Sequence, residues 1–353
     1  MGDDRAAAPP SADRETSSIW PPLPAGRLDC YISLWQLELW LRELVYLELK
    51  SRYGTDWAKY LVALRPGPQR ADSRLTHMPT RERGPLSYLT FDALIKTISR
   101  HRRLFAPYLP VRSVWDARIE EVAQIRNRVA HFRQGHARDL ARVRQLLADI
   151  DKGIWTFCTS YNDAHPIYPP ERDKVARAFI DLDPFPWGLT GDGALIRTGN
   201  APRDMIMSVT IEMLRRPWLK ANLRGQIGGK YGYLYDVHLG ARQNRAFDYA
   251  NLLSNTKRLH ERCCHIFLDA YAGTLRLTIP CVIGASVITD TIRRFTEMAH
   301  HALRPSHAGL LRGGVASLVQ DWPEYVLGPD DPFSLLGPNM PCTMFGSQEF
   351  GHG

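Results

Sequence analysis

Several sequence features are missing from this chain of 353 residues, and each absence excludes a class of protein. There is no run of 18 apolar residues, so we expect no membrane-spanning helix and no membrane partner. The glycine-rich stretch Gly225–Lys230 lacks the spacing and the final Ser or Thr of a phosphate-binding loop, which favours a turn between strands. The start, Met1–Arg5, is polar and unlike a secretory signal, so we expect a cytoplasmic protein.

Cysteine is sparse, and no two cysteines have the Cys-x-x-Cys spacing of a metal or redox site. The pattern favours reduced, buried thiols over a zinc site or a disulfide framework. Cys263, Cys264 and His265 are adjacent, but neighbouring side chains on a helix point about 100° apart and chelate poorly. We therefore expect no metal and no cofactor.

Charge is present in ordinary amount but unevenly placed. Charged residues make up 23% of the chain and the formal net charge is +8. Residues 1–168 hold 25 Lys and Arg against 19 Asp and Glu, whereas the remainder holds 20 against 18. The basic excess therefore lies in the first half, where it is able to attract a phosphate backbone, although a solvated helix surface is the simpler interpretation of charge alone.

Composition and periodicity divide the chain into two predicted domains, a helical bundle followed by a mixed α+β domain. The predicted segments are an extended or disordered start at 1–26, the bundle at 27–163, a Pro-rich linker at 164–190, the α+β domain at 191–327 and an irregular tail at 328–353.

Within the bundle, apolar residues at steps of three and four predict long helices, separated by Gly and Pro and by a polar loop at 65–85. The predicted helices run from Leu28, from Ser87 to His101, from Val114 to Arg133 and from Ala137 to Tyr161, with a short one at Trp57–Leu61. Trp35, Trp40 and Leu47 widen the apolar stripe of the first helix. This indicates burial on more than one side, one of which could face a partner subunit.

In the second domain the period changes to the alternation of strands. Strands are predicted at Met205–Ile211, Tyr231–Leu239 and Thr274–Pro280, and helices at Phe247–Tyr271 and Val287–Leu303. Tyr231, Tyr233 and Tyr235 line one side of the second strand, where sheet packing is a commoner role for them than base stacking.

The segment Glu120–Phe132 carries the strongest functional signal. Asn127 and His131 are four residues apart and share one helix face, and Arg126 is long enough to turn toward the same cleft. An imidazole titrates near neutral pH and suits proton transfer, while a guanidinium stabilises a pentavalent phosphate. Together they suit phosphodiester cleavage without a metal.

The string Arg-Asn-x-x-x-His in an all-helical region resembles the HEPN superfamily, and the resemblance spans roughly residues 28–161. It implies an endoribonuclease that attacks with the ribose 2′-OH, with Arg126, Asn127 and His131 from two copies of the chain forming one composite site in a homodimer. It also implies RNA binding by the neighbouring arginines and a role in antiviral (abortive infection) defence or as a toxin, with a regulatory partner or trigger. The RNA-binding candidates are Arg128, Arg133, Arg102 and Arg103.

One departure from the family concerns the residue two places after the His. In HEPN toxins paired with nucleotidyltransferases this residue is a Tyr that accepts nucleotides, whereas here Phe132 is followed by Arg133. That mode of control is therefore in doubt, and we expect Phe132 to anchor the core.

Plainer interpretations of the same residues stay open. His131 can be a histidine whose charge suits the end of a helix, and Arg126 can pair with Glu120 or Glu121. The bundle can also be a non-catalytic RNA-binding or scaffold module, and the second domain an unrelated small-molecule enzyme, although we find no nucleophile–base pair there.

Overall fold

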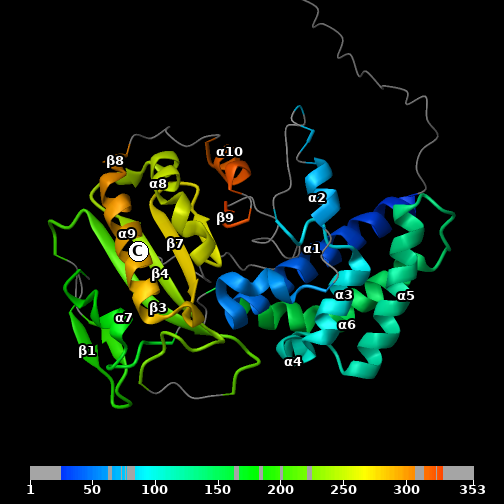
Figure 1. The fold of residues 1–353 in the computed structure, drawn as a ribbon, viewed down its shortest axis with the longest axis horizontal. Coiled ribbons are helices and arrows are strands. Elements are labelled where there is room, and N and C mark those ends of the chain that lie inside the picture. Colours follow the sequence, from blue (N-terminus) through cyan, green and yellow to red (C-terminus); the bar gives the residue numbers. More distant parts are fainter. Residues whose placement is uncertain are drawn as a thin grey trace, which may run out of the picture.

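The computed structural model describes residues 25–62, 66–72, 74–75, 77, 84–162, 167–182, 186–198, 202–220, 225–306, 314–322 and 324–328. It joins a helical part to a sheet part, which confirms the predicted α+β class (Figure 1). None of the described helices is both long enough and apolar enough to cross a membrane. The predicted start at 1–26 and the predicted tail at 328–353 lie outside the described residues, except for residues 25, 26 and 328.

The helical part contains the long helices that the sequence predicts, with shifted ends. Its elements are α1 (Ala25–Tyr53), η1 (Gly54–Tyr60), α2 (Pro66–Asp72), α3 (Phe91–Arg100), α4 (Arg102–Phe105), η2 (Ala106–Tyr108), α5 (Arg112–Ala130) and α6 (Asp139–Thr159). Helix α3 begins late because the Thr90 side chain accepts a hydrogen bond from the Ala93 N–H and caps it. The predicted loop at 65–85 is wrong where α2 forms, since Pro66 suits the first turn of a helix.

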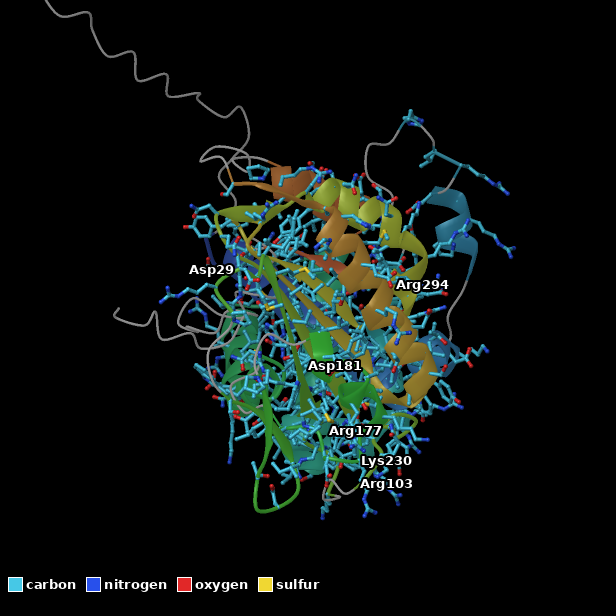
Figure 2. The ribbon with its side chains drawn as sticks, turned by 90° about the vertical axis from the view of Figure 1, so that its left-hand side faces the viewer. Asp29, Arg103, Arg177, Asp181, Lys230 and Arg294 are labelled. Carbon is cyan, nitrogen blue, oxygen red and sulfur yellow. The ribbon has the colours of Figure 1, made fainter. Side chains whose placement is uncertain are left out.

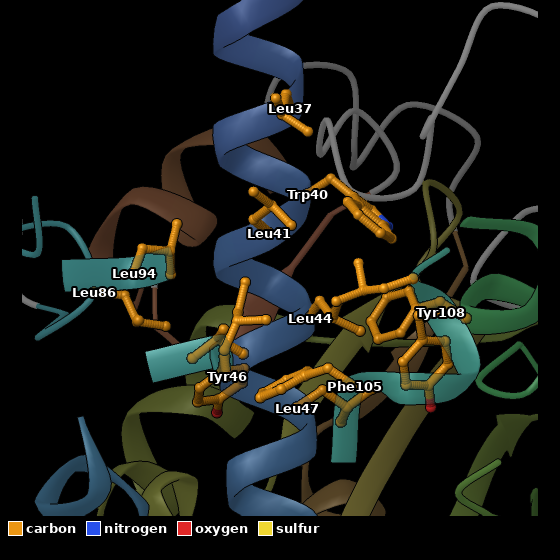
Figure 3. Packing of buried hydrophobic residues seen from close by; sticks show 14 of the residues in the cluster. Leu37, Trp40, Leu41, Leu44, Tyr46, Leu47, Leu86, Leu94, Phe105 and Tyr108 are labelled. Carbon is orange, nitrogen blue, oxygen red and sulfur yellow. The ribbon is translucent and has the colours of Figure 1, made fainter. Parts of the chain in front are cut away.

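Helix α1 is the central element of the core (Figure 3). Leu37, Leu41 and Leu44 are buried, and so are Trp40 and Leu47, which confirms burial on more than one side. Trp35 is different, because 47% of it is exposed. The apolar surface of α1 is thus covered in its C-terminal half and open near its start.

The sheet part is built on a five-stranded sheet with the order β3-β4-β7-β6-β9. Its strands are β3 (Met207–Arg215), β4 (Tyr233–Ala241), β6 (His265–Leu268), β7 (Thr274–Pro280) and β9 (Val326–Leu327). Neighbouring strands are antiparallel except β6 and β9. Two small antiparallel pairs accompany the sheet: β1 (Trp187–Leu189) with β2 (Leu195–Arg197), and β5 (Arg245–Phe247) with β8 (Leu303–Pro305). All three predicted strands are present.

The predicted helix at Phe247–Tyr271 is wrong in its second half. The chain forms α8 (Tyr249–Thr256) and η4 (Lys257–Arg262) and then enters β6, whose four residues are all buried. Pairing with β7 and β9 decides this segment, because tertiary contacts override local helix preference. The predicted helix at 287–303 is α9 (Ala285–His301), preceded by η5 (Cys281–Ile283) and followed later by α10 (Gly314–Asp321).

The stretch predicted as a linker is, in its described part, folded onto the sheet. It contains α7 (Lys174–Arg177) and η3 (Ile180–Leu182), and Ile167 pairs with Met213 at the edge of β3. Val175 and Phe179 are buried in the core of the sheet part. The Asp173 carboxylate caps α7 and also accepts a hydrogen bond of 2.6 Å from the Tyr235 hydroxyl.

The two faces of the sheet differ in chemistry. Tyr235, Val237 and Leu277 face the helices of the sheet part, where α9 crosses the strands in Figure 1. Leu234 and Phe267 belong instead to the core of the helical part. The sheet is therefore covered on both faces, and its central strands are buried almost throughout.

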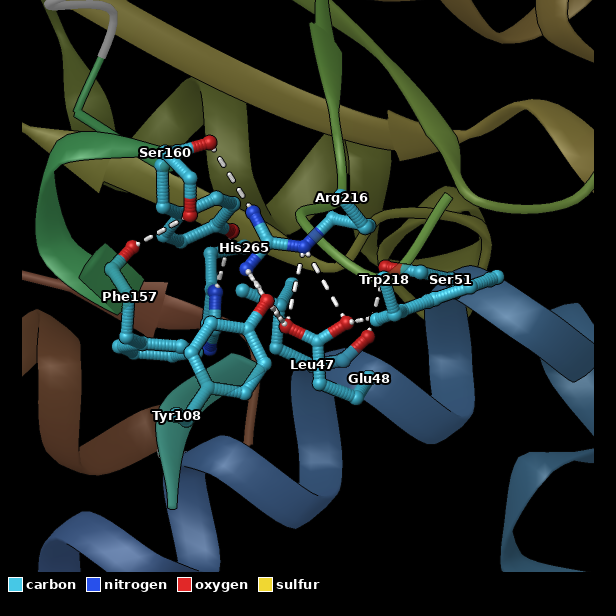
Figure 4. Close-up of polar contacts among 10 residues, drawn as sticks. Leu47, Glu48, Ser51, Tyr108, Phe157, Ser160, Arg216, Trp218 and His265 are labelled. Carbon is cyan, nitrogen blue, oxygen red and sulfur yellow. Dashed lines mark hydrogen bonds and ion pairs between the residues drawn. The ribbon is translucent and has the colours of Figure 1, made fainter. Parts of the chain in front are cut away.

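A buried ion pair joins the two parts (Figure 4). Glu48 of α1 and Arg216, just after β3, are both fully buried, with Arg216 Nη2 2.6 Å from Glu48 Oε1. The Tyr108 hydroxyl and the Trp218 indole N–H also donate to Glu48, each at 2.6 Å, and Arg216 Nη1 donates to the Ser160 carbonyl at 3.0 Å. The carboxylate and the guanidinium are therefore both paired and hydrogen-bonded, as buried charges require.

Candidate functional site

Helix α5 ends earlier than the sequence predicts. Its last residue is Ala130, three residues before the predicted end at Arg133. The Phe132 N–H bonds to the Val129 carbonyl and the Arg133 N–H to the Arg128 carbonyl, which together form a Schellman motif. Phe132 has a φ of +52°, a left-handed conformation that usually falls to glycine. The motif histidine thus lies at the C-cap, beyond the last helical residue.

Asn127 and His131 lie on the open side of this helix end. Both are exposed, and the His131 backbone N–H donates to the Asn127 carbonyl at 3.2 Å. One turn of helix separates them, as predicted from their spacing. An exposed imidazole and an exposed amide therefore lie about one helical turn apart in the chain at this helix end.

Arg126 points elsewhere. Its side chain is 31% exposed, and its Nε lies 3.3 Å from Oε2 of Glu38 on α1. The other oxygen of Glu38 is 2.5 Å from Arg42 Nη2. Two guanidinium groups thus share one carboxylate, which leaves a net positive charge at this point of the surface. Arg126 pairs across helices, rather than with the Glu120 or Glu121 that its sequence neighbourhood offered.

Geometry separates the guanidinium of Arg126 from the imidazole of His131. Five residues along a helix correspond to a rotation of roughly 140° about its axis. From the sequence we expected the Arg126 side chain to turn toward Asn127 and His131. In the structure Glu38 instead holds the guanidinium of Arg126 toward α1. One copy of the chain brings Asn127 and His131 together but directs Arg126 to a different side of α5.

The arginines predicted to bind RNA fall into two groups. Arg128 and Arg102 have structural partners: Arg128 pairs with the buried Asp139 at 2.5 Å, and Arg102 Nη2 donates to the Pro110 carbonyl at 2.7 Å. Burial also lowers the pKa of Arg102 from its ordinary value. Arg133 and Arg103 are exposed, and Figure 2 shows Arg103 at the surface.

Phe132 does not anchor the core, so that prediction is wrong. It is 97% exposed, since the left-handed turn at the helix end directs it away from α1 and α6. The Phe132 ring is therefore exposed to solvent at the position after His131.

A second polar cluster, which was not predicted, lies on the face of the sheet that meets the helical part. Arg276 Nε lies 2.7 Å from Oδ1 of Asp236, both side chains are fully buried, and His238 Nε2 lies 3.3 Å from the same carboxylate. Burial opposes the charge of Asp236, but Arg276 and His238 outweigh it and lower its pKa to about 2. The alternation of the two strands was the sequence signal that could have indicated this cluster. Asp236 and His238 occupy polar positions of one strand, and Arg276 occupies a polar position of the neighbouring strand.

This cluster is structural in its geometry. Arg276 Nη2 donates to the Tyr161 carbonyl at 2.6 Å, so it links the end of α6 to the sheet. Nearby, the Tyr161 hydroxyl lies 2.6 Å from His265 Nδ1, and His265 Nε2 is 3.5 Å from Glu43 of α1. Burial lowers the pKa of His265 despite Glu43. Arg276, Asp236 and Tyr161 are all fully buried, out of reach of a substrate.

The cysteines are buried as predicted. The five described ones have free thiols in apolar surroundings, and burial raises the pKa of both Cys263 and Cys264 to about 12. Among the described residues, no three His, Cys, Asp or Glu side chains gather as metal ligands would. Cys342 lies outside the described residues.

The chain matches no protein-family model, no curated protein and no solved structure.

Proposed function

We propose that this protein is a metal-independent endoribonuclease of the HEPN class, acting in antiviral defence or as a toxin. The observation that carries the proposal is the pair Asn127 and His131, exposed at the open end of α5, with Arg126 on another side of the same helix in a net positive cluster with Arg42 and Glu38. Proton transfer, orientation and charge stabilisation are the three tasks of RNA cleavage by an internal 2′-OH, and this end of α5 holds a group for each.

In the proposed reaction His131 of one copy takes the proton of the 2′-OH, and His131 of a second copy gives a proton to the departing 5′ oxygen. The 2′ oxygen bonds to phosphorus as the bond to the 5′ oxygen breaks, which leaves a 2′,3′-cyclic phosphate. Asn127 orients the phosphate or His131 through its amide. Arg126 supplies the cation that stabilises the extra negative charge of the transition state, since a guanidinium is always protonated.

A second copy of the chain completes the site in this proposal. Because Arg126 and His131 diverge around α5, one copy does not direct both groups to one phosphate. In the first turns of α1, four apolar side chains at steps of three and four are exposed to solvent, with exposed fractions between 42% and 56%. They are Leu28, Tyr31, Ile32 and Trp35. This α1 stripe borders Glu38, one turn beyond Trp35, so a copy that covers the stripe lies beside Arg126.

The decisive experiment is RNA cleavage by single-residue variants. His131→Ala and Arg126→Ala are each expected to reduce cleavage of a labelled RNA by at least about a hundredfold, the scale of lost acid–base or charge stabilisation. His300→Ala, which removes an exposed histidine of α9, is the matched control and keeps full activity. Circular dichroism confirms that each variant is folded. Full activity of His131→Ala with a chelator present would contradict the assignment.

One observation favours the second candidate, a non-catalytic HEPN-like RNA-binding or scaffold module. Arg126 is already paired with Glu38, as a structural arginine would be. The two functions differ in their products, because only the nuclease leaves 2′,3′-cyclic phosphate ends. Salt-sensitive RNA binding by the purified protein without any cleavage would favour the module.

A further inference from the structure

A run of stacked aromatic and cationic side chains lies at the other end of α1. The Arg52 guanidinium carbon is 3.5 Å from the ring centre of Tyr231, whose other neighbour, the Trp218 ring, is nearly parallel to it at 6.1 Å. On the α1 side, Arg52 lies 5.8 Å from the Tyr53 ring, and Tyr53 stacks on Tyr60 at 3.5 Å. We call these five residues the stacking platform.

The platform is held rigidly by buried groups. The Trp218 indole N–H donates to Glu48, as Figure 4 shows. The Gly232 N–H donates to the Ser51 carbonyl at 3.0 Å, which fixes the loop of Tyr231 onto α1. Gly232 has a φ of +78°, and a Cβ there would lie 2.8 Å from the Trp218 ring, so only glycine lets the loop approach this closely.

Two rings of the stacking platform are partly exposed to solvent. Tyr231 is 46% exposed and Tyr60 is 36% exposed, whereas the next two tyrosines of the same stretch, Tyr233 and Tyr235, are buried in the sheet. The three tyrosines at steps of two therefore have different roles. The rings of Tyr233 and Tyr235 pack in the sheet, whereas the ring of Tyr231 is at the surface. Flat rings held rigidly at a surface are suited to stacking on other flat rings.

The segment that carries Trp218 and Tyr231 is basic. From Met213 to Tyr235 the chain carries five basic residues and no Asp or Glu. Of these, Arg215, Lys220 and Lys230 are exposed, and Figure 2 shows Lys230 at the edge of the molecule. Aromatic rings on a segment rich in exposed cations are typical of surfaces that stack bases and contact phosphates.

We infer that the stacking platform binds unpaired bases of single-stranded RNA, with Tyr231 stacking on a base and Lys220 and Lys230 contacting phosphates. The inference rests on the proposed function, which requires RNA as the ligand. Arg52 and Glu38 are 14 residues apart on α1, so the platform is about 21 Å along the helix from the Arg126 pair. It is therefore a second RNA contact, separate from the cleavage site, that selects unpaired strands.

The test is the affinity of the full chain for a labelled single-stranded oligouridylate, measured by fluorescence anisotropy. The His131→Ala background prevents cleavage during the measurement. Tyr231→Ala is expected to weaken binding at least about fivefold, the lower end of the loss of one base–ring stack. Tyr231→Phe keeps the ring and retains the affinity. Tyr271→Ala is the matched control, because Tyr271 is 85% exposed in the turn between β6 and β7.

Two further measurements separate stacking from charge. Lys220→Gln is expected to reduce the slope of log affinity against log salt by about 0.7, the value for one phosphate contact to a single strand. Tyr231→Ala leaves that slope unchanged. Unaltered affinity of Tyr231→Ala, or an equal loss with a fully paired duplex, overturns the inference. Since binding is measured without cleavage, a platform that binds RNA in a protein without nuclease activity would refute only the proposed function.

Discussion

The histidines of this chain differ in how far neighbouring residues surround the imidazole. His260 is 2% exposed, stacks on Phe295, and has Thr256 Oγ1 3.2 Å from its Nε2, while its buried Nδ1 makes no hydrogen bond within the described part of the chain. Burial, together with Lys257, lowers the pKa of His260 to about 4. His131 is the opposite case, an exposed imidazole that solvent surrounds. A buried histidine such as His260, whose pKa is lowered in the folded chain, couples folding to pH.

Acid should destabilise the protein through His260. A histidine whose pKa is lower in the folded chain than in the unfolded chain contributes stability that is complete above pH 6.5 and is lost as the pH falls toward 4. The full loss is about 3 kcal/mol. We expect His260→Phe, which keeps a ring against Phe295, to remove that part of the pH dependence of urea unfolding between pH 7 and 4.

His265 also has a lowered pKa, so the difference between the wild type and His260→Phe is the informative quantity. The lowered pKa of Asp236 acts mainly below about pH 4, at the acid end of this window. Equal pH dependence in the wild type and the variant would show that His260 is charged in the folded protein.

At the scale of elements, α1 carries three acidic residues at intervals of five positions, and each faces a different partner. Glu38 pairs with Arg126 of α5, Glu43 approaches His265 of β6, and Glu48 binds Arg216. One helix thus contacts the candidate site, the sheet and the junction of the two parts. Its first turns are the exception, because the α1 stripe is apolar and exposed.

The α1 stripe should control the oligomeric state. Trp35→Glu places a charge in the middle of the stripe, where burial against a second copy would leave it unpaired. We expect analytical ultracentrifugation to show a dimer for the wild type and a monomer for Trp35→Glu, with cleavage lost in the monomer. Val111→Glu is the matched control, because Val111 is 71% exposed and precedes α5 at the end of that helix opposite Arg126. A wild type that sediments as a monomer at micromolar concentration contradicts the two-copy site.

At the scale of the whole molecule, the two parts are joined by shared burial. The core of the helical part includes Leu214, Leu234 and Phe267 from the sheet, and the Glu48–Arg216 pair is buried between the parts. Close packing reinforces the helical side: a Cβ on Gly153 of α6 would lie 1.7 Å from the Tyr108 carbonyl oxygen. Such contacts favour unfolding of both parts as one unit.

Removal of the charge at this junction should destabilise both parts together. Glu48→Gln leaves the buried guanidinium of Arg216 without its counter-ion, which costs about 3–5 kcal/mol. We expect urea unfolding to remain a single transition, followed alike by circular dichroism and by tryptophan fluorescence, at a lower midpoint. Asp92→Asn, which breaks an exposed ion pair with Lys96, should change stability by less than about 1 kcal/mol. Two separate transitions in the wild type would contradict the joined arrangement.

The sequence by itself determined the α+β class, the long helices and the three main strands, because apolar periodicity and Gly or Pro breaks are local signals. It also placed Asn127 and His131 one helical turn apart at the end of a helix, since that spacing is local. Only the tertiary structure decided the direction of Arg126, the exposure of Phe132 and the strand at His265–Leu268. Each depends on a partner distant in sequence or on a turn at a helix end, and a periodic pattern carries no information about either.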